Sequence, residues 1–63
     1  MWEETVAERL TIISEIDWLH FEPPMLVQPG ETFWVKERTL HVRGLDGAVR
    51  TVAARAHRSD DRR

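Results

Sequence analysis

The sequence predicts an all-β fold, a small antiparallel barrel or curved sheet of four to five strands. Three observations support this class. Short segments rich in β-branched and aromatic residues recur along the chain. The segment Gln28-Pro29-Gly30-Glu31 has the proline and glycine of a type II turn. Asp46-Gly47 separates two alternating segments, which is typical of a β-hairpin.

The first segment, residues 5–21, fits either a strand or a helix. A period of two places five apolar residues on one face: Val6, Leu10, Ile12, Ile16 and Trp18. A helical period aligns Trp2 with Val6, Leu10 and Ile13, and Thr5-x-x-Glu8 matches a capping box. The β-branched residues of 10–13 favour a strand. A helix over residues 4–15, packed on a three-stranded meander, is the alternative and would make the fold α+β.

The next elements follow from local chemistry. Glu22-Pro23-Pro24 is expected to stop any regular element, because proline cannot donate a hydrogen bond to a ladder. Met25-Leu26-Val27 is a short candidate strand. Residues 32–36, 39–44 and 48–56 are three further candidate strands after the turn at 28–31. This order of elements resembles the small five-stranded barrels grouped as SH3-like, in architecture alone.

The register of the last three strands is predicted by keeping apolar residues together. A tight turn at 37–38 pairs Phe33 with Val42 on the inner face. A two-residue or four-residue loop at Asp46-Gly47 keeps Val42 on one face with Val49, Thr51 and Ala53. A three-residue loop would set Val42 opposite Arg50 and mix the two faces, so this register is disfavoured.

The predicted outer face of this meander is the candidate binding site, and it contains Trp34, His41, Arg43 and Arg50. An aromatic ring among arginines is typical of a nucleobase-stacking platform. It is equally typical of a protein–protein hot spot. The alternative is that the acidic N-terminal segment folds over this face, which would make Trp34 a core residue.

Charge is divided between the two halves of the chain. Residues 1–31 carry about −6 and residues 32–63 about +4, for a net charge of −2. Such a division ties the halves together, within one fold or between copies, or leaves a basic face for an anionic partner. Sixty-three residues make a single small domain, predicted over residues 1–57, with a frayed charged tail at 58–63.

The composition argues against an enzyme. Cysteine is absent, which excludes disulfides and thiolate metal sites. His20, His41 and His57 have no metal-site spacing, and neither Ser14 nor Ser59 lies in a nucleophile motif. We therefore expect no catalytic residues, no metal, no cofactor and no small-molecule substrate.

The function expected from these residues is that of a non-catalytic binding module. It would act through protein–protein contact, with a protein partner or with itself as a homo-oligomer, as an accessory, regulatory or assembly protein. The alternative is a nucleic-acid-binding protein that uses the aromatic and arginine face. No apolar stretch is long enough to span a membrane, and the acidic N-terminus differs from a signal peptide, so a cytoplasmic location is expected. The preference for arginine over lysine is typical of a GC-rich bacterial or phage genome.

Overall fold

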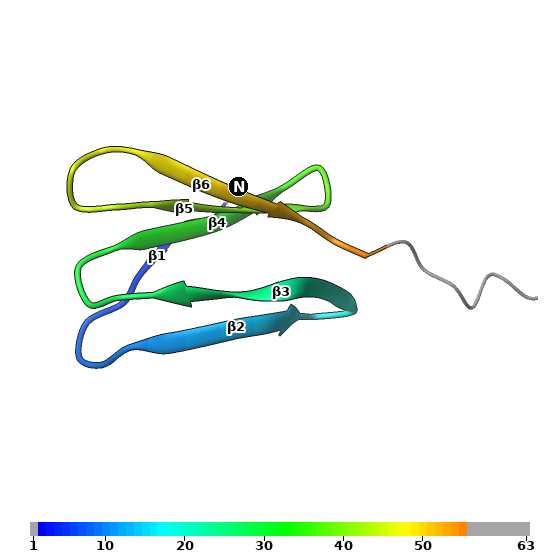
Figure 1. The fold of residues 1–63 in the computed structure, drawn as a ribbon, viewed down its shortest axis with the longest axis horizontal. Coiled ribbons are helices and arrows are strands. Elements are labelled where there is room, and N and C mark those ends of the chain that lie inside the picture. Colours follow the sequence, from blue (N-terminus) through cyan, green and yellow to red (C-terminus); the bar gives the residue numbers. More distant parts are fainter. Residues whose placement is uncertain (1, 56–63) are drawn as a thin grey trace, which may run out of the picture.

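The computed structural model describes residues 2–55 and shows six antiparallel strands (Figure 1). The strands are β1 (Glu4–Thr5), β2 (Thr11–Ile16), β3 (Leu19–Val27), β4 (Thr32–Lys36), β5 (Thr39–Arg43) and β6 (Val49–Ala53). Residues 2–55 contain no helix, so the predicted all-β class is confirmed. The predicted tail at 58–63 lies outside the described residues.

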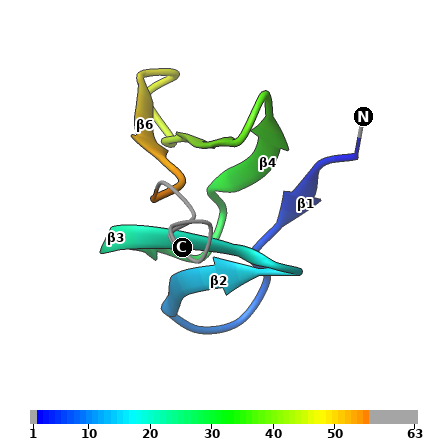
Figure 2. The ribbon, with the colours of Figure 1, turned by 90° about the vertical axis from the view of Figure 1, so that its right-hand side faces the viewer.

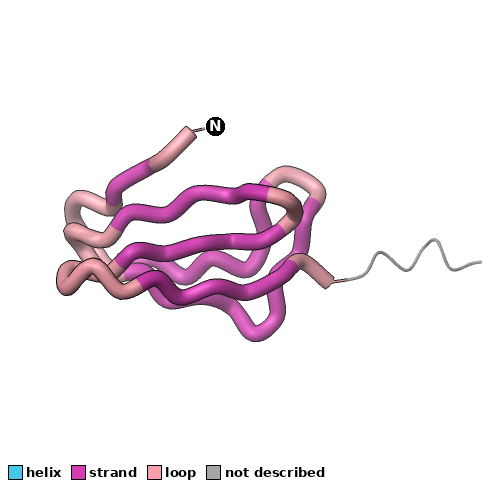
Figure 3. The backbone as a smooth tube through the Cα atoms, turned by 90° about the horizontal axis from the view of Figure 1, so that it is seen from above, coloured by secondary structure: helices cyan, strands magenta, loops and turns pink. Residues whose placement is uncertain are grey.

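Two sheets form the fold. One has the strand order β1-β4-β5-β6, and the other is the β2-β3 hairpin, which lies below the first sheet in Figure 2. Their facing sides meet in a small core, to which five fully or nearly fully buried residues contribute: Ile13, Phe21, Val27, Leu40 and Val42. Figure 3 shows the strands running along the long axis, with the turns gathered at its two ends.

The chain closes into a barrel-like arrangement where β3 meets the residues that follow β6. Phe21 forms an antiparallel bridge with Ala54, and the Arg55 N–H donates to the His20 carbonyl at 2.8 Å. These bonds connect the hairpin to the edge of the larger sheet. A small curved sheet of this kind agrees with the predicted architecture.

The N-terminal segment is a strand rather than a helix, as the β-branched residues favoured, but the predicted face was only partly correct, since Val6 and Ile16 alone of its five residues pack against the core. Ile13 is buried, whereas Leu10, Ile12 and Trp18 are exposed. The reason is a bulge in the hairpin, because the pairing shifts between Ile13 and Glu15. The bulge changes the alternation midway along β2, so a single period of two cannot describe the whole segment.

The prediction that Pro23 and Pro24 stop the strand was also wrong, since β3 runs through both. The pairing passes from Glu15↔His20 to Ile13↔Met25, which leaves the prolines without β2 partners. A proline in a bulge does not remove a ladder hydrogen bond. Both prolines are therefore accommodated inside the strand.

Two predicted turns are confirmed. Gly30 has φ of 94°, and the Glu31 N–H donates to the Gln28 carbonyl at 3.0 Å, as in a type II turn. The tight turn after β4 pairs Phe33 with Val42 as predicted. Its two central residues, Glu37 and Arg38, have φ of 55° and 62°. Neither is a residue type that favours this left-handed conformation.

We expect Glu37→Asn to stabilise the fold by about 0.5 kcal/mol, because asparagine adopts the left-handed region more readily than glutamate. Urea unfolding followed by circular dichroism measures the change. Glu37→Val is the matched control and should destabilise, since a β-branched residue is strained at this φ. A Glu37→Asn chain that is less stable than its parent would contradict the prediction.

The predicted register of the last hairpin was wrong. Val42 pairs with Arg50, the arrangement that mixes an apolar residue with an arginine. The loop has three residues, 45–47, because Gly47 adopts φ of 91° and the Gly44 N–H donates to the Ala48 carbonyl at 2.8 Å. The Asp46 carboxylate accepts the Ala48 N–H at 3.0 Å. The hydrogen bonds and the positive φ of the loop therefore determined the register, although another register would have kept the apolar residues of the two strands together.

The opposite charges of the two halves of the chain pair with each other within one fold. Three ion pairs join an acid of the first half to an arginine of the second: Glu3–Arg43, Glu31–Arg50 and Glu22–Arg55. Each one connects segments far apart in the sequence. The charge division thus links the two halves of a single fold in the described part of the chain.

Candidate functional site: the outer face of β4 and β5

The outer face of β4 and β5 contains a stack of aromatic and cationic side chains. Trp34 and His41 are directly opposite each other in the ladder, and their rings are parallel within 3° at a centroid distance of 5.3 Å. The Arg43 guanidinium carbon lies 5.2 Å from the Trp34 ring centroid, in a cation–π contact. We call Trp34, His41 and Arg43 the Trp34 face. Three of the four predicted site residues are therefore in contact.

The N-terminal segment extends this face at its edge instead of covering it. β1 pairs with β4 through Thr5↔Thr32, and the two threonine hydroxyls are 2.9 Å apart. Glu3 reaches Arg43, with a carboxylate-to-guanidinium distance of 3.6 Å between two exposed side chains. The β2-β3 hairpin lies on the opposite side of the sheet (Figure 2). Trp34 is half-buried and is not part of the buried core.

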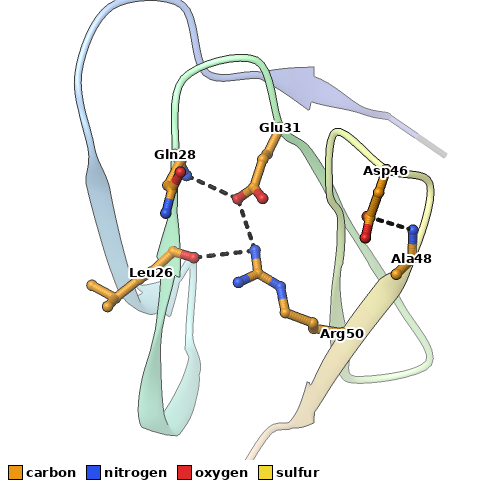
Figure 4. A network of polar contacts seen from close by, with 6 residues as sticks. All are labelled: Leu26, Gln28, Glu31, Asp46, Ala48 and Arg50. Carbon is orange, nitrogen blue, oxygen red and sulfur yellow. Dashed lines mark hydrogen bonds and ion pairs between the residues drawn. The ribbon is translucent and has the colours of Figure 1, made fainter.

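Arg50, the fourth predicted residue, lies on the opposite face of the sheet. Its cross-strand partner is the buried Val42, so its side chain points toward the hairpin. The guanidinium donates to the Glu31 carboxylate at 2.7 Å and to the Leu26 carbonyl at 3.3 Å (Figure 4). The prediction that Arg50 shares a surface with Trp34 was wrong, because it depended on the incorrect hairpin register.

Glu31 is the central residue of this contact, and sequence analysis did not identify it. The residue is only 9% exposed, and its carboxylate also accepts the Gln28 N–H at 2.9 Å. A buried carboxylate requires such partners because desolvation disfavours its charge. In the sequence, Glu31 is an acid directly after Pro29-Gly30, and an acid at the end of a turn is normally expected to be exposed to solvent. The network joins β3, the turn at 28–31 and β6, and has a structural role.

Within residues 2–55, no group of three or more histidine, cysteine, aspartate or glutamate side chains could hold a metal ion. His57 lies outside the described residues. In the same part of the chain, no helix has the length and apolar character needed to cross a membrane.

Comparison with known proteins gives no further assignment: no family model matches, and neither curated proteins nor solved structures give a match.

Proposed function

We propose that this protein is a non-catalytic binding module that recognises another protein through the Trp34 face. The observation that supports this proposal is the stack of Trp34, His41 and Arg43 on a face that the β2-β3 hairpin leaves uncovered. Tryptophan and arginine are the residues most enriched in interface hot spots. Because the side chains are already held against one another, less conformational entropy is lost when a partner binds.

The occupied tryptophan ring favours a protein partner over a nucleic acid. A nucleobase platform needs an accessible ring on which a base can stack. Here the Trp34 ring already contacts the His41 ring and the Arg43 guanidinium. Glu3 also offsets the charge of Arg43, which weakens the attraction for a phosphate backbone. Nucleic-acid binding is therefore the alternative outcome of the test below.

We expect Trp34→Ala to weaken binding of the partner by roughly thirtyfold or more, which corresponds to a hot-spot residue of about 2 kcal/mol. Affinity capture from an extract of the source cells, followed by mass spectrometry, would identify the partner. Its affinity would then be measured by calorimetry with the purified proteins. Trp18→Ala is the matched control, because Trp18 is an exposed tryptophan in the turn of the β2-β3 hairpin, where its ring contacts the Arg38 guanidinium and is not part of the Trp34 face. The control should bind like the parent.

A fluorescence titration distinguishes the two classes of partner. In a Trp2→Phe, Trp18→Phe background, Trp34 is the only tryptophan left in the chain. A single-stranded oligonucleotide should give no saturable quench in this background, even at low salt. A saturable quench that weakens steeply as salt rises would overturn the proposal and support nucleic-acid binding.

A further inference from the structure

β2 has a free edge and an exposed apolar face. Its only strand partner among residues 2–55 is β3, so the opposite edge carries unpaired backbone groups. This strand is at the bottom of Figure 1, with no strand beyond it. On the solvent side of the hairpin, Ile12 is 62% exposed, its cross-strand partner Leu26 is 50% exposed, and Leu10 is 51% exposed.

Such an edge is unusual in a monomeric protein. Sheet edges are generally protected from further pairing by lysine, by proline or by a covering element. The run Leu10-Thr11-Ile12-Ile13 contains neither lysine nor proline. The bulge in the hairpin lies beyond this run, where the pairing shifts between Ile13 and Glu15. The free edge and the apolar residues therefore belong to the same short segment, so a strand that pairs with this edge would also bring its own apolar side chains beside Ile12.

The charges in and beside β2 fit a second copy of the same strand: Glu15 lies near the end of β2, and Arg9 lies two residues before its start. Two residues that are directly opposite in antiparallel strands point to the same face of the sheet. A two-fold axis between two copies of β2 must therefore pass through a residue, and not between two residues, if the apolar faces of both copies are to lie on one side. An axis through Ile12 pairs Ile12 with itself and places Arg9 opposite the partner's Glu15. An axis through Thr11 would instead pair Arg9 with the partner's Ile13. An axis through Ile13 would pair Ile12 with the partner's Ser14.

We propose that two copies of this chain associate through β2, in antiparallel register about Ile12, to form a four-stranded sheet in the order β3-β2-β2-β3. The pairing satisfies the free edge of each copy. It also joins the two faces formed by Leu10, Ile12 and Leu26 into one continuous apolar surface. Because these residues lie on the hairpin and not on β4 or β5, the contact is separate from the Trp34 face.

A charge-reversal experiment tests the register. Sedimentation velocity of the parent at micromolar concentrations should show a species heavier than the 7.4 kDa monomer. Arg9→Glu and Glu15→Arg should each weaken self-association about tenfold, because each creates two like-charge contacts about the axis. An equal mixture of the two variants should associate as tightly as the parent, since both acids of one variant then face the two arginines of the other.

Two further variants act as controls. Lys36→Glu makes the same kind of charge change on an exposed residue of β4 and should leave association unchanged. Ile12→Lys places two ammonium groups together at the axis and should abolish association, while circular dichroism shows a folded monomer. A parent chain that stays monomeric and folded would overturn the proposal. So would a mixture that associates no better than either charge variant alone.

Discussion

Phe21→Ala should remove a large part of the stability of the fold, about 3–5 kcal/mol. Phe21 is only 2% exposed, lies in β3 and forms the bridge to Ala54, so it packs where the two sheets meet. Truncating a buried phenylalanine costs about 3–5 kcal/mol. A domain of this length has a total stability of roughly 3–9 kcal/mol, at about 0.05–0.15 kcal/mol per residue. Urea unfolding followed by far-ultraviolet circular dichroism measures the loss.

Phe33→Ala is the matched control for this prediction. Phe33 is half-buried on β4, and its ring makes an edge-to-face contact with Trp2 at 5.7 Å. Its truncation removes less buried area and should cost clearly less than the loss of Phe21. Equal losses at the two positions, or a loss below about 1 kcal/mol at Phe21, would show that the junction between the sheets contributes little.

Glu31→Ala should be the most destabilising change of a charged residue, at about 2–3 kcal/mol, between the values for exposed and fully buried pairs. The side chain of Glu31 is 12% exposed, whereas that of Arg50 is 46% exposed. Truncation removes the acceptor for the Gln28 N–H and leaves Arg50 with only the Leu26 carbonyl. A double-mutant cycle with Arg50→Met, measured by urea unfolding, isolates the coupling between the two side chains.

The Glu22–Arg55 pair provides a control of nearly equal geometry. Its nitrogen-to-oxygen distance is 2.6 Å, against 2.7 Å for Glu31–Arg50, but its side chains are 62% and 64% exposed. Exposed pairs generally contribute less than about 1 kcal/mol. The same cycle at this pair should therefore give the smaller coupling. Equal couplings would mean that distance, and not burial, determines the strength of these contacts.

Local patterns in the sequence predicted the parts of the fold that depend on neighbouring residues. The strands around Phe33 and Val42, their register and the Pro-Gly turn at 28–31 are all confirmed. In each case the residues that determine the structure lie within one hairpin or one turn. The bulge that contains Pro23 and Pro24 could not be found in this way, because it depends on how two strands fit together.

The candidate site was predicted in part for the same reason. Trp34, His41 and Arg43 lie on the central hairpin, where the register was correct. Arg50 was misplaced because its position depends on a three-residue loop and on Glu31, whose carboxylate lies 19 residues away in the chain. The register was predicted by matching apolar residues within one hairpin, and this comparison does not include a residue as distant as Glu31. The pairing of Arg50 with the core residue Val42 is stable because the Glu31 carboxylate accepts a hydrogen bond from the guanidinium.

The bridge between Phe21 and Ala54 closes a long loop of the chain, which bears on how fast the chain can fold. β-Hairpins of adjacent strands form within about 1–10 μs, because their ends are close in sequence. The bridge and the hydrogen bond from the Arg55 N–H to the His20 carbonyl join segments that are far apart in the sequence. Closing so long a loop costs more entropy than closing a turn. We therefore expect this long-range closure to limit the folding rate more than the formation of the turns does.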